Sequence, residues 1–144
     1  MFNPRHSGPS ERLAEWRQIR KSNSASAKQI IEQFGNVEIQ QRYLDFYTPD
    51  SWPNVFEIVQ EGWFDQTGLT LVMLATLHHL GFVNTDDIQI NVISNHITGV
   101  EGAVFVYQGH CYNFMPGEIV SEEYMQEHST KYDSFIITKD KLFD

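Results

Sequence analysis

The apolar positions in the first half of the chain recur at the spacing of helices. A clear example is the helical face formed at i, i+3, i+4 and i+7 by Ala27, Ile30, Ile31 and Phe34. Ser10 is expected to cap the first helix, Gly35 to end the second, and Pro53 to begin the fourth. The predicted helices span residues 11–21, 27–34, 37–46, 53–62 and 66–81. The last, capped by Asp65, is apolar on most sides and is therefore expected to be the buried central helix.

From residue 88 onward the period changes to two, which predicts strands. Residues 88–94 alternate apolar and polar positions, as a half-exposed strand does, whereas residues 103–107 (AVFVY) are apolar throughout, as in a strand covered on both faces. Residues 108–114 are expected to turn at Gly109 into a third strand, making a meander. A short helix is predicted over 121–128 and a final strand over 132–138.

Helices followed by antiparallel strands predict an α+β fold. Within it we expect a helical N-terminal arm over residues 1–35 and an α+β core over residues 36–144. A chain of 144 residues is long enough for one domain and short for two, so we expect arm and core to form a single compact domain.

Composition narrows the class of protein. An apolar fraction of 41% is that of a folded chain. The longest apolar run, residues 69–77, is much shorter than a membrane span, and the N-terminus lacks the pattern of a secretory signal. The single cysteine, Cys111, rules out an internal disulfide and fits a reducing compartment. We therefore expect a cytoplasmic protein that does not act at a membrane.

The net charge of −9 is unevenly distributed along the chain. Residues 1–35 hold six basic and three acidic residues, a net charge of +3, and residues 36–144 hold four and sixteen, a net charge of −12. The acidic body repels nucleic acid, so we expect no nucleic-acid partner. The basic arm either engages an acidic partner or folds back on the acidic body. The partner-binding candidates are Arg12, Arg17, Arg20 and Lys21.

Eight residues between Trp52 and Gly81 form a pattern of residue types at fixed spacing. Its positions are Trp52, Glu57, Ile58, Val59, Gly62, Asp65, Leu80 and Gly81. This pattern resembles that of the bacterial transglutaminase-like cysteine proteinases, a branch of the papain-like superfamily, and the two patterns align without a gap. In those proteinases the residues Gly-Asp-Cys open a long helix. The resemblance implies a small papain-like core with a central helix and an antiparallel sheet, on which the N-terminal helices pack.

The resemblance also places the positions of the catalytic triad. The cysteine position is occupied by Gln66, the histidine position by Gly102 or Ala103, and the orienting position by Asn113. Thiol catalysis needs a thiolate at the helix N-terminus and a base beside it. Since neither is present at these positions, the resemblance implies a degenerate site and a pseudoenzyme.

Other polar residues offer weaker chemistry. Cys111 and His110 would form a nucleophile–base pair, but neighbouring strand residues point to opposite faces, so a buried cysteine beside an exposed imidazole is favoured. His78 and His79 are adjacent on a helix and lack the i, i+4 spacing of a metal-binding pair. We therefore expect no metal site. No cofactor is expected either, because a phosphate-binding glycine loop is missing.

The start of the predicted central helix has three interpretations. Backbone N–H groups at a helix N-terminus can form part of a binding pocket, for which the ligand-binding candidates are Trp52, Trp63, Asp65 and Gln66. Alternatively, Trp52, Trp63 and Phe64 fill the former cleft and Asp65 serves only as a cap. A third interpretation, in which Asp65 and Glu57 form an acid–base pair, would give hydrolase chemistry.

The sequence favours a non-catalytic accessory or protein-interaction module whose partner is another protein. The alternative is a hydrolase or amide-transfer enzyme with a relocated catalytic set, such as Asp65, Asn113 and a histidine from elsewhere. A homo-oligomer remains open, with residues 1–35 as its interface. In its general sequence character the chain resembles small proteins of large tailed phages, although no residue motif supports this resemblance. A phage origin would place it in the host cytoplasm.

Overall fold

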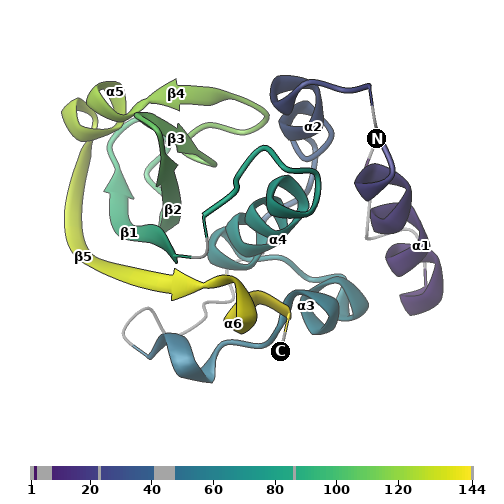
Figure 1. Cartoon of the computed structure of the whole chain (residues 1–144). Helices are drawn as coiled ribbons and strands as arrows, with labels where there is room; N and C mark the ends of the chain where they lie inside the picture. Colours follow the sequence, from purple (N-terminus) through teal and green to yellow (C-terminus); the bar gives the residue numbers. More distant parts are fainter. Residues whose placement is uncertain (1, 3–7, 23, 41–47, 86, 144) are drawn as a thin grey trace.

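A layer of helices packs against one face of a five-stranded antiparallel sheet (Figure 1). The structure, a computed structural model, describes residues 2, 8–22, 24–40, 48–85 and 87–143. The helices are α1 (Pro9–Arg20), α2 (Ala27–Glu32), the short η2 (Pro49–Ser51), α3 (Val55–Glu61), α4 (Gln66–His79), α5 (Glu122–Glu127) and α6 (Lys139–Phe143). The strands are β1 (Asp87–Asn95), β2 (Glu101–Tyr107), β3 (His110–Tyr112), β4 (Ile119–Ser121) and β5 (Ser129–Thr138). The α+β fold class is therefore confirmed.

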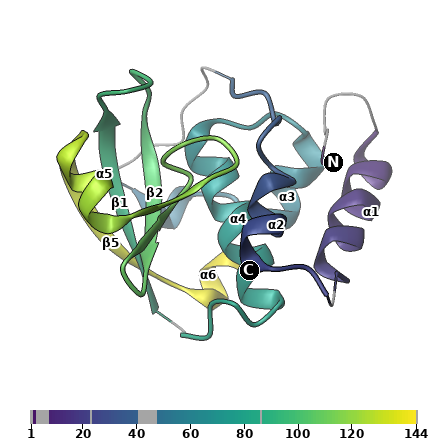
Figure 2. The same ribbon diagram turned by 90° about the horizontal axis from the view of Figure 1, so that it is seen from above.

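The central helix is α4, as its apolar sequence predicts. Every residue from Thr67 to Leu77 is buried, because the sheet covers one side of α4 and the other helices cover the rest (Figure 1, Figure 2). The helix α1 lies farthest from the sheet in both views. It is tied to α4 by Trp16, whose Nε1 donates to Thr76 Oγ1 at 2.8 Å. The N-terminal helices thus share one buried apolar cluster with α4.

Several predicted helix boundaries are wrong. The cap of α1 is Gly8 rather than Ser10, since the Glu11 carboxylate accepts from the Gly8 N–H and Pro9 begins the helix. The helix α3 begins after Asn54, whose side chain accepts from Glu57 N at 2.9 Å, so Pro53 precedes the helix. Gly62 ends α3 in the left-handed conformation, as expected.

The segment predicted as a helix over 37–46 is not helical where it is described. Gln40 N donates to Phe64 O at 2.7 Å, and Ile39 forms a parallel bridge with Phe64, so residues 37–40 run beside the start of α4. Residues 41–46 lie outside the described part. The helix α2 ends at Glu32, and Phe34 is buried from the turn that follows it.

The sheet has the order β4-β3-β2-β1-β5. The meander of β1, β2 and β3 and the burial of β2 on both faces are as predicted. The prediction that β1 is half exposed is wrong, because a second apolar cluster under α5 covers its outer face. That cluster comprises Ile93, Val104, Cys111, Phe114 and Met125. No helix in the described part of the chain has the length and apolarity needed to cross a membrane.

Candidate functional site

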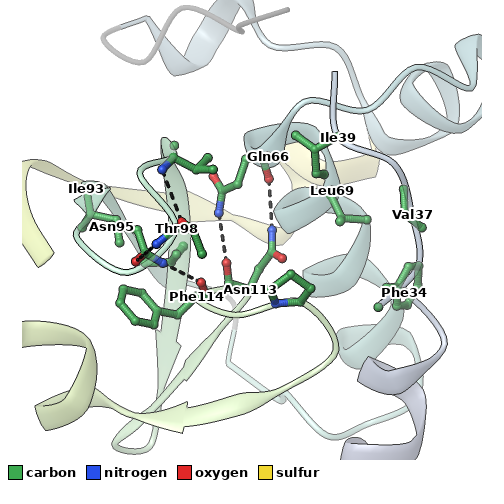
Figure 3. Close-up of a pocket in the computed structure, with 15 residues that line it drawn as sticks. Phe34, Val37, Ile39, Gln66, Leu69, Ile93, Asn95, Thr98, Asn113 and Phe114 are labelled. Atoms are coloured by element: carbon green, nitrogen blue, oxygen red, sulfur yellow. Dashed lines mark hydrogen bonds between the residues drawn. The ribbon is translucent and has the colours of Figure 1, made fainter. Parts of the chain in front are cut away.

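Three residues distant in sequence meet at the N-terminal end of α4. Gln66 is the first residue of α4, Gly102 lies in β2, and Asn113 follows β3. The Gln66 side chain donates from Nε2 to Asn113 O at 3.1 Å, and the Asn113 side chain donates from Nδ2 to Gln66 O at 3.1 Å (Figure 3). This reciprocal pair of hydrogen bonds ties the helix to the loop after β3.

The Gln66 side chain occupies the space that a side chain at position 102 would need. A Cβ atom on Gly102 would lie 1.9 Å from Gln66 Oε1 and 2.7 Å from its Cδ. Such distances are far inside van der Waals contact, so one of the two groups would have to move. Gln66 and Gly102 are therefore a matched pair, and a histidine at position 102 is incompatible with Gln66 as it lies here.

Two threonines of α4 extend this network to β2. Thr70 Oγ1 accepts from Asn113 Nδ2 at 2.7 Å and lies 2.6 Å from Ala103 O, to which it donates. Thr67 Oγ1 accepts from Ala103 N at 3.2 Å. Asn113 has a φ of 67°, a left-handed conformation that asparagine tolerates better than most residues. The sequence signal for these threonines is their interruption of an otherwise apolar helix.

One atom of this network has no hydrogen-bond partner in the described part of the chain. Gln66 Oε1 is buried and accepts no hydrogen bond from any described residue. Leaving a buried carbonyl unpaired costs about 1–3 kcal/mol. An unpaired acceptor of this kind therefore calls for an explanation.

A cavity of about 120 Å³ adjoins the Gln66 side chain, and we call it the Gln66 pocket. Its walls come from the segment after α2, from α4, from β1, β2 and the turn between them, and from the loop after β3 (Figure 3). The lining residues are mostly apolar: Phe34, Gly35, Val37, Ile39, Gln66, Leu69, Ile93, Asn95, Thr98, Val100, Gly102, Val104, Asn113, Phe114 and Pro116. Ile39 and Val100 lie at its border with solvent, 39% and 40% exposed.

The other ligand-binding candidates lie elsewhere. Asp65 caps α4, with Oδ1 accepting from Gly68 N at 2.6 Å. Trp52 is buried, and its carbonyl accepts from Lys141 Nζ at 2.7 Å, whereas Trp63 is 52% exposed. Among the four candidates only Gln66 lines the pocket. Trp52 and Trp63 thus do not fill the pocket.

Cys111 is buried in the cluster under α5, outside the Gln66 pocket. Burial, with a smaller contribution from Glu122, raises the pKa of its thiol to about 12. His110 is exposed, so the expected pairing of a buried cysteine with an exposed imidazole is confirmed. His96 Nε2 lies 2.8 Å from Thr130 Oγ1 and does not line the pocket. Within the described ranges, no group of three or more histidines, cysteines or carboxylates is placed to hold a metal.

Part of the basic arm contacts the body of the protein. Arg12 donates from Nε to Val59 O at 3.0 Å and also reaches Gln60 O, at the end of α3. The Arg20 guanidinium lies 4.0 Å from the centre of the Trp16 ring, and burial, followed by repulsion from Arg17, lowers the pKa of Arg20. Of the four partner-binding candidates, Arg17 and Lys21 are exposed.

No known protein family and no curated protein sequence matches this chain. Solved structures do match it. Calcium-bound Legionella pneumophila LapG has a TM-score of 0.68 at 14% identity, covering 92% of this chain and 81% of that one. Two further LapG structures, one of them EGTA-treated, give TM-scores of 0.65 and 0.64 at 16% identity, each covering 92% of this chain and, respectively, 81% and 79% of LapG. At this identity the likeness shows the fold alone, which is transglutaminase-like.

Proposed function

We propose that this protein is a non-catalytic accessory or protein-interaction module on a transglutaminase-like fold. The observation that supports the proposal is the position of the Gln66 amide, which lies over Gly102 and bonds to Asn113 O. A carboxamide is neither a nucleophile nor a base, and glycine supplies no side chain at all. The positions that the resemblance assigns to cysteine and histidine therefore carry no reactive group. The expectations of a cytoplasmic location and a phage origin stay predictions from the sequence.

The single thiol of the chain does not replace the missing nucleophile. With a pKa of about 12, Cys111 is ionised to only about one part in 10⁵ at pH 7. It also packs in an apolar cluster with Ile93, Phe114 and Met125. Neither its protonation state nor its access to solvent suits covalent catalysis.

A relocated catalytic set has no support among the described residues. Asp65 is engaged as the cap of α4, and none of the described residues that line the Gln66 pocket is a histidine. His96 and His110, the two histidines that would have favoured such a set, do not line the pocket. We therefore put forward no enzymatic function beside the binding module.

The test is a search for turnover. A broad peptide library is incubated with the protein, and mass spectrometry looks for cleaved, deamidated or cross-linked peptides, with papain as the positive control. The wild type is compared with the variants Cys111→Ala and Gln66→Ala. We expect no turnover above buffer for any of the three. Turnover by the wild type that either substitution abolishes would refute the proposal.

A further inference from the structure

The Gln66 pocket has the size of one apolar side chain. Its volume is about 120 Å³, and an engineered apolar cavity of about 150 Å³ takes up benzene. The Gln66 pocket is smaller than that cavity and suits a side chain of leucine size. The walls that would contact this group include Phe34, Val37, Leu69, Ile93, Val104 and Phe114.

The border of the pocket is also apolar. Ile39 and Val100 line the pocket and remain 39% and 40% exposed, and Ile97, next to the lining residue Thr98, is 46% exposed. A small molecule inside the pocket would leave this border in water. A polypeptide that inserts one side chain and covers the border would remove it from water, as in interfaces where a central anchor is surrounded by contacts that exclude solvent.

The described polar groups of the pocket offer no open hydrogen-bonding site to a ligand. Asn95 Oδ1 accepts from Ile97 N at 2.8 Å, and its Nδ2 donates to Phe114 O at 2.8 Å. Asn113 Nδ2 is bonded to Gln66 O and Thr70 Oγ1. Gln66 Oε1 has no partner among the described residues, but it is buried against Gly102 and is not open to a ligand, so the pocket recognises its occupant by apolar contact.

The surroundings of the pocket are acidic. The exposed residues Glu32 and Glu38 flank the wall segment after α2, Glu101 lies between Val100 and Gly102, and Glu118 follows the loop after β3. The sequence holds no lysine or arginine from residue 43 to residue 130. A positively charged segment would therefore be attracted to this side of the molecule, and an acidic one repelled.

We propose that the Gln66 pocket is the anchor site for a basic segment of a partner polypeptide. One side chain of leucine size enters the cavity and packs beside the Gln66 side chain. Lysine or arginine residues on either side of the anchor face Glu32, Glu101 and Glu118. This assignment names the chemistry of the partner and rests on the proposed interaction function.

The test uses the ¹⁵N-labelled protein and two synthetic peptides, acetyl-Gly-Lys-Leu-Lys-Gly-amide and its counterpart with alanine in place of leucine. NMR spectra are recorded during titration with each peptide. We expect the leucine peptide to shift the Gln66 side-chain amide and the backbone amides of Leu69 and Val104 in a saturable way. The alanine peptide is expected to bind at least about tenfold more weakly, because it buries three fewer carbons.

A matched pair of variants separates the pocket from the overall charge. Val100→Lys and Ile136→Lys add the same charge at exposed apolar positions, 40% and 64% exposed, but only Val100 borders the pocket. We expect Val100→Lys to abolish binding of the leucine peptide and Ile136→Lys to weaken it by less than about threefold. Equal loss in both variants would show that only net charge attracts the peptide, and would overturn the proposal.

The remaining outcomes distinguish the two proposals. An intact leucine peptide that causes no saturable shift at the pocket overturns the anchor site and leaves the non-catalytic function standing. A peptide that mass spectrometry finds cleaved overturns the non-catalytic function instead. Pocket shifts that grow with protein concentration in the absence of peptide would assign the site to a second copy of this chain, and would also overturn the proposal.

Discussion

The matched pair of Gln66 and Gly102 makes a quantitative prediction about stability. In Gly102→Ala, the new Cβ would lie 1.9 Å from Gln66 Oε1 and 3.0 Å from Gln66 Cβ, so the Gln66 side chain must leave its place. Its bond to Asn113 O, 3.1 Å long, is then lost. The lost bond costs about 1 kcal/mol and the crowding about 1–3 kcal/mol, offset by up to about 1 kcal/mol for alanine over glycine in a strand. We expect Gly102→Ala to lower the free energy of unfolding by about 2 kcal/mol.

A double-mutant cycle tests whether Gln66 causes that loss. Gln66→Ala alone removes the bond to Asn113 O and is expected to cost about 1–2 kcal/mol. In Gln66→Ala/Gly102→Ala the crowding disappears, so the second substitution adds almost nothing to the cost of the first. The expected coupling free energy therefore equals the cost of Gly102→Ala, about 2 kcal/mol, well above the scatter of independent sites.

The assay is urea unfolding followed by tryptophan fluorescence, with thermal unfolding as a second readout, where about 2 kcal/mol corresponds to a fall of about 6 °C in Tm. Val106→Ala serves as a control for a general loss of packing in β2, since Val106 packs against the apolar cluster under α5 and does not line the Gln66 pocket. Additive costs in the double variant would refute the reasoning. In that case contact with the Gln66 side chain would not be the reason why a side chain at position 102 is unfavourable.

Three further predictions follow from the structure. Because burial raises the pKa of Cys111 to about 12, the folded state favours the neutral thiol, so the urea midpoint should fall from about pH 9 toward pH 12 in the wild type and less steeply in Cys111→Ala. Trp16→Phe removes the Nε1 bond to Thr76 Oγ1 and part of the ring volume, and should lower the free energy of unfolding by about 2 kcal/mol in urea. Asp65→Ala removes the cap of α4 and should cost about 1 kcal/mol, whereas Asp65→Asn, measured in the same way, should cost less than half of that.

The elements that could be predicted from the sequence are those whose signals are local. Asp65 followed by a long apolar segment is sufficient to place the start of α4, and Gly62 is sufficient to end α3. Residues 37–40 were misassigned because their partner, Phe64, is far along the chain and periodicity carries no information on such pairing. The strand β4 and the helix α6 are too short to show a period.

The candidate site was accessible to sequence reasoning only in part. The resemblance pointed to Gln66, Gly102 and Asn113, which the structure brings into contact. It could not give the reciprocal bonds between Gln66 and Asn113, since these depend on the left-handed backbone at Asn113. Nor could it give the pocket wall from Phe34 and Val37, because tertiary packing brings that segment to α4.

The central claim is that the fold keeps the place of a catalytic pair whose side chains are gone, and restoring them tests it most directly. The variants Gln66→Cys and Gln66→Cys/Gly102→His are made in a Cys111→Ala background, and the rate of alkylation by iodoacetamide is measured from pH 5 to pH 10. A thiol at the start of α4 beside an imidazole should ionise below pH 7, whereas the variant without the histidine should ionise at a clearly higher pH. Coincident profiles for the two variants would contradict the account, because positions 66 and 102 would then not be placed as a catalytic pair.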